Sequence, residues 1–453
     1  MGEYRRAVLA AATWCVVGAG FAAEPVCGSE AMDAPLRQRL QRLEAQVEVL
    51  RAETDGRRWL TERRAEEIRA LTRDVLADAD RRRCLADRGL TAGRDRFFFI
   101  ASPDGNFKLN FLGMVQTRFV LSIQDDGTVE DSTRSGFENS RTRFGVLGHV
   151  GDPSWKFGVW GGWLSSGRSW LVESWIRKDF GNGWVFDFGH FKLPTSHEWI
   201  IKEFHQQFIE RSLLNARWTG AGKGIRACYN GERIHVLTAV TDGAMTWNRP
   251  WSTGPDSTFG PLPWQMSSEF ALTGRVEWLL NGSWTSRYDF ESFPGDEGNI
   301  VLGAAAHYQV GEYGTADDEN DVVQWVVDAT GEFGGGSVFV AGFGTHFENS
   351  TADRDEWGLL AQGGVFLDEH WELIGRLEYG DLDGAGSVSD DLLLLTVGVN
   401  RFWNRHGLKW MADLGYAFEP VDAAWGGAGA GWRADEAGGE GQIVLRTQLQ
   451  LLF

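Results

Sequence analysis

The sequence predicts an all-β protein, a transmembrane antiparallel β-barrel of about 16 strands, preceded by an α-helical coiled coil. Three observations lead to this fold class. Residues 96–453 alternate apolar and polar side chains with a period of two, and residues 33–90 follow a heptad pattern. The chain is also rich in glycine and aromatic residues, with 58 Gly, 28 Phe and 22 Trp, which suits a β architecture with many turns.

The first 23 residues have the features of a secretory signal peptide. Arg5 and Arg6 precede an uncharged apolar stretch, Ala7 to Ala23, that ends in small residues suited to cleavage. A membrane anchor is the alternative, but the stretch is rich in Ala and Gly and has only the minimum length for a spanning helix. We therefore expect residues 1–23 to be a leader that is removed on export.

Composition excludes several classes of protein. A mean hydropathy of -0.28 argues against a helical membrane protein, and a net charge of -19 argues against a nucleic-acid partner. The four cysteines are too scattered for a disulfide framework or a metal site, which leaves one disulfide or a link between chains open. They are Cys15, Cys27, Cys84 and Cys228.

Residues 33–90 predict a periplasmic coiled coil. Apolar residues at 4-3-4-3 spacing form a seam, with a polar middle around Gly56. A single solvated helix is the alternative, and neither form offers chemistry. We expect an oligomerising stalk that could reach the cell wall. The seam residues are Leu36, Leu40, Leu43, Val47, Leu50, Ile68, Leu71 and Val75.

The strands of residues 96–453 are long and carry charge on one face only. The first runs over 107–123, which exceeds the roughly ten residues needed to cross a bilayer at a tilt. Segments 267–280, 370–380, 407–418 and 442–453 repeat the pattern. The last of these ends in Phe453 and would pair with the first strand in a closed barrel, and a terminal Phe resembles the end signal of outer-membrane barrels.

The connections favour a membrane barrel over a soluble sandwich, which would also alternate. Long acidic or Gly-rich segments, such as 124–136, 348–356 and 419–441, alternate with short turns, such as 151–154, 181–183 and 368–370. Long outer loops and short periplasmic turns are typical of bacterial outer-membrane barrels. Two connections deviate: 165–169 is short where a long loop is expected, and 281–298 is long where a turn is expected, so a strand could be misplaced there.

A set of motifs between residues 107 and 220 resembles the phosphate-selective porins of the O and P type. Arg141 and Arg143 lie on the second strand, and Gly189, the pair Phe191-Lys192 and Pro194 follow. Glu198 and the run Glu210-Arg211-Ser212 complete the likeness. The resemblance implies a homotrimeric porin of 16 strands whose lumen is narrowed by the loop after strand five. It also implies that Arg141, Arg143, Lys192, Glu198, Lys202, Glu210 and Arg211 line the pore or its constriction.

The inward-facing parity of the strands adds Arg118, Arg226 and Arg275 to the pore-lining residues. The same parity also places acids inside, so the wall is mixed and favours a general or weakly selective pore. Two alternatives stay open: the arginines could form an inner-wall ladder with neighbouring acids, and Lys202 and His205 could belong to a solvated loop. The inward acids are Glu173, Asp187, Glu277, Asp328, Glu372, Glu378 and Asp413.

No catalytic, cofactor or metal pattern emerges. His190, His197 and His205 lack ligand spacing and have no partnered nucleophile. We expect a bacterial outer-membrane porin, embedded in lipid, that passes small hydrophilic solutes or ions by diffusion, anions such as phosphate among them. The alternative is a structural outer-membrane protein whose coiled coil tethers the barrel to the cell wall. A barrel-embedded enzyme is the weakest hypothesis.

Overall fold

The computed structural model describes residues 38–39, 41–46, 89–95, 97–126, 129–163, 169–244, 268–312, 319–349, 353–436, 439 and 441–453. Residues 38–39 and 41–46 are helical and exposed. The predicted leader and most of the predicted coiled coil lie outside the described residues, as do Cys15, Cys27 and Cys84. Both segments therefore stay predictions.

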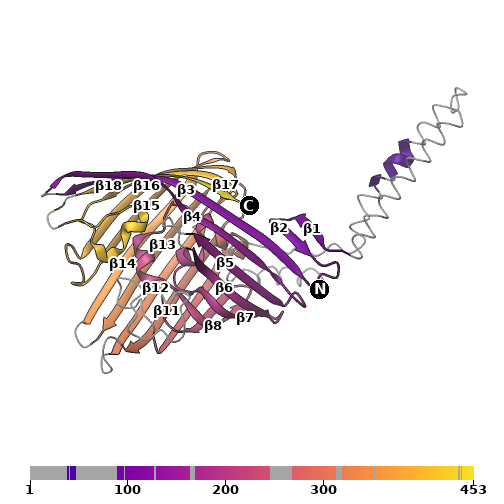
Figure 1. Cartoon of the computed structure of the whole chain (residues 1–453), viewed down its shortest axis with the longest axis horizontal. Coiled ribbons are helices and arrows are strands. Elements are labelled where there is room, and N and C mark those ends of the chain that lie inside the picture. The colour runs from indigo at the N-terminus through magenta and orange to yellow at the C-terminus, as the bar shows by residue number, and fades with distance from the viewer. Residues whose placement is uncertain are drawn as a thin grey trace, which may run out of the picture.

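Sixteen long antiparallel strands form the body of the described chain (Figure 1). Period-two alternation from residue 107 onward drives them, because each strand can then present one apolar and one polar face. They are β3 (Lys108–Asp126), β4 (Val129–His149), β5 (Trp155–Trp163), β6 (Ser169–Asp179), β7 (Trp184–Lys192), β8 (Ala221–Asn230), β9 (Ile234–Thr241), β10 (Phe270–Gly282), β11 (Asn299–Glu312), β12 (Glu319–Glu332), β13 (Gly336–Glu348), β14 (Asp353–Phe366), β15 (Trp371–Asp381), β16 (Asp391–Asn404), β17 (Leu408–Ala417) and β18 (Gln442–Leu452).

The strands close into a barrel. Each pairs with its neighbours in the sequence, and β18 pairs with β3 from Gln442↔Gln124 to Leu452↔Met114. Closure covers both edges, so no ladder of backbone groups is left unpaired in an apolar surrounding. This confirms the predicted all-β antiparallel barrel of 16 strands.

A short hairpin extends the sheet beyond the barrel. It consists of β1 (Thr91–Arg94) and β2 (Phe98–Ala101), and β2 pairs with the start of β3 at Lys108–Phe111. β2 and β18 pair with the same edge of β3, β2 at its start and β18 further along the strand. Phe97, just before β2, is buried against the apolar cluster inside the barrel, so the hairpin is anchored at the mouth from which β3 starts.

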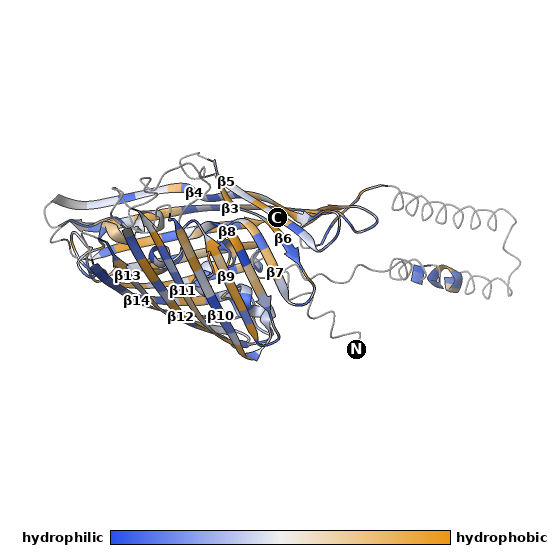
Figure 2. Cartoon of the chain, turned by 90° about the horizontal axis from the view of Figure 1, so that it is seen from below, coloured by the Kyte–Doolittle hydropathy of each residue, from blue (hydrophilic) through white to orange (hydrophobic). Residues whose placement is uncertain are grey.

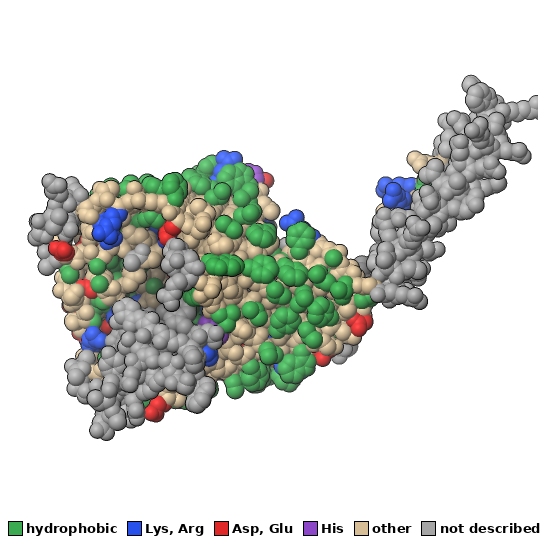
Figure 3. All heavy atoms as spheres, in the orientation of Figure 1, with side chains coloured by type: hydrophobic (Ala, Val, Ile, Leu, Met, Phe, Trp, Pro, Cys, Tyr) green, Lys and Arg blue, Asp and Glu red, His purple; other side chains and the backbone are tan. Residues whose placement is uncertain are grey.

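The outer face of the barrel is apolar. Figure 2 shows hydrophobic and hydrophilic residues alternating along the strands, and Figure 3 shows apolar side chains spread over the flank of the barrel. Ile176, Phe188, Trp278, Val327 and Leu359 are each about half exposed. An exposed apolar belt of this extent requires lipid rather than water around it. Among the described residues, no helix is both long and apolar enough to span a membrane.

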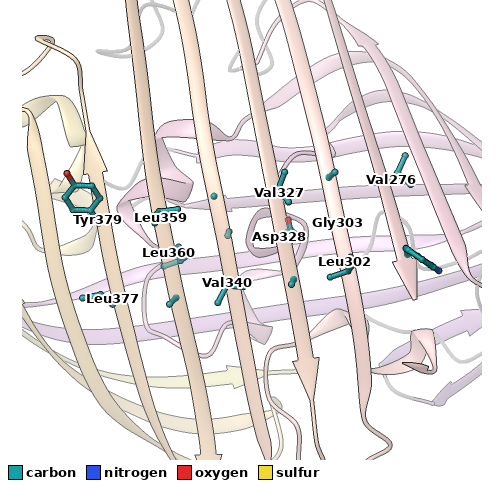
Figure 4. A pocket seen from close by; sticks show the side chains of 16 residues that line it. Val276, Leu302, Gly303, Val327, Asp328, Val340, Leu359, Leu360, Leu377 and Tyr379 are labelled. Carbon is teal, nitrogen blue, oxygen red and sulfur yellow. The ribbon is translucent and has the colours of Figure 1, made fainter. Parts of the chain in front are cut away.

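A hollow of about 840 Å³ lies on this apolar outer face, over β10 to β15 (Figure 4). Small residues such as Gly303, Ala304 and Gly342 form its bed, and larger side chains such as Leu302 and Leu359 surround them. The hollow lies on the lipid-facing side of the wall, and Asp328, which also borders it, bonds Arg275 on the inner side.

The connections correct three expectations. The predicted long loops at 124–136 and 348–356 are mostly strand, because β3 and β4 are separated only by 127–128, and β13 and β14 only by 349–352. Beyond the bilayer both strand faces meet water, so the alternation that marks a strand disappears there. Segment 283–298 contains no further strand, only η2 (Trp284–Tyr288), and the strand count needs no revision there.

Three connections fold into the barrel and fill it. Segment 193–220 carries α4 (His197–Ile200), η1 (Glu203–His205) and α5 (Leu213–Trp218), and segment 418–441 carries η3 (Ala423–Trp425) and η4 (Gly427–Ala430). Both come from the end with long loops, whereas 283–298 comes from the end with short turns. Most inward-facing side chains of the described strands are consequently buried. The interior is a packed, largely polar core crossed by protein from both ends.

Candidate functional site: the charged interior along strands β3 to β7

Segment 193–220 builds the centre of the candidate site. Its two helices begin at serines, as helix starts favour: Ser196 Oγ accepts from Trp199 N at 3.0 Å, and Ser212 Oγ accepts from Asn215 N at 3.0 Å. The Glu198 carboxylate ties the helices together by accepting from Ser212 N at 2.9 Å and from Ser212 Oγ at 2.6 Å. Glu198 is therefore a structural clasp inside the segment, fully buried, rather than a residue facing solute.

Buried contacts anchor segment 193–220 to the opposite wall. Arg217 makes a bidentate pair with Glu356 of β14, with both nitrogen–oxygen distances 2.6 Å. Leu213 N donates to Glu378 of β15 at 2.7 Å, and His197 N donates to Asp328 of β12 at 3.0 Å. Charge-assisted bonds of this kind are roughly twice as strong as neutral ones, so the segment is held inside the lumen as a fixed obstacle.

An arginine row on β3 and β4 faces segment 193–220. Arg118 and Arg141 both pair with Glu210, and Arg118 Nε also donates to Glu138 at 2.7 Å. The Arg141, Glu210 and Arg211 side chains are 15%, 12% and 11% exposed, whereas most inward side chains are more deeply buried. This row is therefore the least buried part of the charged interior in segment 193–220 and its facing strands.

Next to this row, several cations surround Glu203 of η1. Arg143 Nη1 lies 2.5 Å from Glu203 Oε1, and Lys192 Nζ and Arg211 Nη1 each lie 3.9 Å from the same oxygen. Lys202 pairs instead with Glu173 of β6, at 2.5 Å. Here the structure brings together Arg143, Lys192 and Arg211, three of the residues that the resemblance named, around an acid that it did not name.

Arg226 and Arg275 lie further around the wall, beneath segment 193–220. Arg226 shares Asp187 with Arg177, at 2.7 and 2.6 Å. Arg275 bonds Asp328 at 2.8 Å and the carbonyl of Thr195 at 2.7 Å. Both arginines are buried, so they form part of the ladder of wall charges and support the segment above them.

An apolar layer lies on the short-turn side of the Glu203 cluster. Leu147 lies four residues beyond Arg143 on the same face of β4, and the strand register places it near Trp160 of β5 and Trp175 of β6. Phe204 of η1 packs into the same cluster. These residues enclose a void of about 10 Å³, which Glu173 and Lys202 also line; this volume is at the lower limit for one ordered water. We name Leu112, Leu147, Trp160, Trp175 and Phe204 the apolar floor.

Segment 283–298 closes the other half of the interior. Lys409 of β17 pairs with Glu291 at 3.1 Å, with both side chains fully buried. The backbone carbonyl of Tyr288 lies 2.8 Å from His205 Nδ1, and Phe290 packs edge-on against His197. The two infolded segments therefore meet inside the barrel.

Sequence reasoning missed several residues of the site. Glu203 lies directly beside Lys202, yet no local pattern distinguishes it, because its partner Arg143 is 60 positions away in the chain. Lys202 and His205 are buried, so the solvated-loop alternative for them is wrong. The expected arginine ladder with acids describes the observed pairs, and Cys228 is buried in the wall. Among the described residues, no group of His, Cys, Asp and Glu could hold a metal ion.

The fold belongs to the class of porin-like β-barrels with 16 strands. The chain is similar to the anion-selective porin from Comamonas acidovorans, with 14% identity and a TM-score of 0.53 over 77% of this chain and 100% of that one. It is also similar to the outer-membrane channel DcaP of Acinetobacter baumannii, at 11% identity and a TM-score of 0.47, over 76% and 98% of the two chains. A third similar structure is OprB of Pseudomonas putida, with 12% identity and a TM-score of 0.46, over 76% of this chain and 94% of that one.

No family model matches the chain, and no curated protein matches it. At these identities the likeness to solved structures establishes the fold alone. The coarser part of the resemblance, a porin-like barrel, is confirmed. The narrower phosphate-selective group stays a proposal, since the neighbours named above are porins and channels of other kinds.

Proposed function

We propose that the chain is an outer-membrane channel that passes small hydrophilic solutes or ions by passive diffusion. One observation carries this proposal: a closed barrel with an apolar exterior holds a charged row inside, and its side chains Arg141, Glu210 and Arg211 stay 15%, 12% and 11% exposed. The path would follow the inner wall of β3 to β7, past segment 193–220. A barrel exterior of this kind places the protein in the bacterial outer membrane.

The channel would be narrow. Segments 193–220, 283–298 and 418–441 leave the inner wall mostly buried, and the apolar floor lies across the path. Hydrophobic constrictions in channels resist ions by excluding water. We therefore expect low conductance, dominated by brief openings in which Phe204 moves away from Trp160 and Trp175.

The proposed selectivity is weak, with anions such as phosphate as candidates. Many cations of the interior face an acid, for example Arg118 with Glu138 and Lys202 with Glu173. The neighbour from Comamonas acidovorans is named an anion-selective porin, which is a property of that protein. Reversal potentials in a salt gradient show whether this channel prefers anions or cations. A preference for cations would rule out phosphate selectivity.

Planar-bilayer recording of the purified protein tests the proposal directly. Discrete conductance steps after insertion would support it. A protein that inserts, keeps its barrel and yet gives no steps under any voltage would overturn it.

That second result would favour another function, a structural outer-membrane protein tethered to the cell wall through residues 33–90. The packed interior is the observation that favours this alternative, because a barrel whose inner wall is buried can act as an anchor without conducting. Binding of purified peptidoglycan by the full chain, and its loss when residues 33–90 are removed, would support the tether.

The expected assembly is a homotrimer with a periplasmic stalk. The resemblance and the heptad pattern of residues 33–90 motivate it. Chemical crosslinking of the full chain and of a chain lacking residues 33–90 tests both parts. A trimer that persists without the stalk would assign assembly to the barrel walls. Removal of residues 1–23 is a separate prediction, which sequencing of the mature N-terminus tests.

A further inference from the structure

Glu203 is surrounded by cations from separate parts of the chain. Arg143 comes from β4, Lys192 from the end of β7 and Arg211 from the return of segment 193–220. All three approach one oxygen of Glu203, at 2.5, 3.9 and 3.9 Å. The other oxygen, Oε2, is buried, and neither it nor Arg143 Nη1 makes a hydrogen bond with the described residues, so the contact with Arg143 is an ion pair. A single carboxylate oxygen thus lies near three cations.

The three cations have no other close acid in common. Lys192 Nζ donates to the carbonyls of Trp199 and Ile201 at 2.9 and 3.3 Å. Arg211 donates to the carbonyls of Glu198 and Ile201 at 3.1 and 2.6 Å. Backbone carbonyls orient these cations but do not neutralise them. Without Glu203 the group would hold cationic side chains with no carboxylate beside them in a largely dehydrated space, which is strongly unfavourable unless an anion replaces the lost carboxylate.

The cluster adjoins the less buried arginine row. The Arg211 side chain is 11% exposed and follows Glu210, which pairs with Arg141, 15% exposed. An ion that enters from the end with long loops meets this row first and the Glu203 cluster next. The apolar floor lies beyond. The Glu203 cluster therefore lies between the row that contains Arg141 and the apolar floor.

We propose that Glu203 sets the ion selectivity of the channel, because its carboxylate occupies the position at which a solute oxyanion would bind between Arg143, Lys192 and Arg211. The chemical class of that ligand is a carboxylate or a phosphate-type oxyanion, since such oxygens match the guanidinium and ammonium donors. This inference rests on the proposed channel function. It explains how a wall with many arginines can conduct without strong anion preference: the chain supplies its own anion.

The test compares Glu203→Gln with the wild type in planar bilayers under a potassium chloride gradient. We expect the chloride-to-potassium permeability ratio to rise by about threefold or more, because an unpaired cation cluster attracts anions to the path. Inorganic phosphate added to the chloride solution should then reduce the chloride current of the variant at concentrations that leave the wild-type current unchanged.

Two controls separate a local effect from a general loss of negative charge. Glu138→Gln removes another lumen carboxylate, one whose partner Arg118 keeps Glu210, and should shift the ratio less. The double variant Glu203→Gln with Arg143→Gln restores the local charge balance and should return the ratio toward the wild-type value. It also keeps the test usable if the single variant folds poorly, which heat-modifiable mobility on gels reports.

The outcomes are distinct. A wild type that conducts, with a Glu203→Gln ratio unchanged or shifted no more than that of Glu138→Gln, would overturn the inference and leave the channel function intact. A double variant that keeps the anion preference of the single variant would overturn it as well. A wild type that inserts without conducting would overturn the proposed function and this inference together.

Discussion

Gly113 of β3 lies beneath the aromatic ring of Phe453. The two residues exchange backbone hydrogen bonds, from Gly113 N to Phe453 O at 2.7 Å and from Phe453 N to Gly113 O at 2.9 Å. A Cβ on Gly113 would lie 2.4 Å from two ring atoms of Phe453. Both residues face outward, so the ring covers the seam between the first and last barrel strands on the lipid side.

Gly113→Val should therefore weaken barrel closure. The added side chain displaces the ring of Phe453, with an expected loss of about 1 kcal/mol in the free energy of unfolding. Urea titration followed by heat-modifiable mobility measures it. Gly136→Val is the matched control, because a Cβ at Gly136 meets no atom within 4 Å. Equal stability of the two variants would show that the ring contact contributes nothing to the seam.

The barrel strands were predictable because lipid and water impose a period of two. Segments 370–380 and 407–418 were predicted as strands and correspond to β15 and β17 within one residue at each end. The prediction failed where lipid no longer distinguishes the two faces, as at 129–136, which is strand with polar residues on both sides. Alternation of apolar and polar residues shows that the two faces of a strand meet different environments. It does not show directly that the segment is hydrogen-bonded as a strand.

The interior was only partly predictable, because its contacts join distant positions. The parity of β3, β4, β8 and β10 placed Arg118, Arg141, Arg226 and Arg275 inside, but nothing local pairs Arg217 with Glu356, 139 positions away. Segment 281–298 suggested a misplaced strand because it is long where a short turn is expected. These residues are there to fill the lumen, where Phe293 packs on Phe366 and Phe402.

Removing Arg217 should release segment 193–220. Arg217→Ala leaves Glu356 buried and uncompensated, and breaking a buried pair in this way typically costs about 3–5 kcal/mol. We expect a large loss of stability in urea titration, together with new protease cleavage within 193–220. Arg217→Lys keeps the charge but loses the bidentate geometry, so its stability should lie between those of the wild type and Arg217→Ala. Wild-type protection of the segment in Arg217→Ala would contradict the anchoring role.

Phe204→Ala should open the apolar floor. Removing the ring lets water enter between Leu147, Trp160 and Trp175, and a wetted constriction conducts ions more readily. We expect single-channel conductance to rise by about twofold or more, measured in symmetrical potassium chloride.

Phe343→Ala is the matched control for that variant. Phe343 is also a fully buried aromatic residue, but it packs against Trp218 in the other half of the interior. It should lose similar stability, about 3–5 kcal/mol, without a gain in conductance. An equal gain in both variants would point to general loosening rather than to the apolar floor.

Replacing residues 284–297 with a short Gly-Asp-Gly turn should widen the channel from the short-turn end. The replacement removes Glu291 and Phe293 from the lumen and exposes Lys409 to water. We expect higher conductance than in the wild type and a shift toward anions, because Lys409 loses its acid partner. Conductance that stays at the wild-type level would mean that segment 193–220 alone limits the flow.

Asp422 should make two long-loop connections sensitive to acid. Its carboxylate accepts from Ser387 N and Val388 N at 2.7 Å each and from Ala424 N at 2.8 Å, and so joins segment 418–441 to segment 382–390. Burial favours a raised pKa, but these backbone donors outweigh it and hold the pKa of Asp422 below its usual range. The carboxylate is therefore charged in the native loop at neutral pH.

A lowered native pKa stabilises the contact above the usual Asp pKa of about 3.9, and the contribution is lost as the pH falls through the native value. Asp422→Asn should thus cost about 1–2 kcal/mol of loop stability at pH 7, seen as faster proteolysis of 382–390 and 418–441. The difference from the wild type should shrink below about pH 4, because the unfolded carboxyl takes up its proton there and the native carboxyl follows only at lower pH. A difference that stays constant down to pH 3 would show that shape, and not charge, makes Asp422 necessary in this contact.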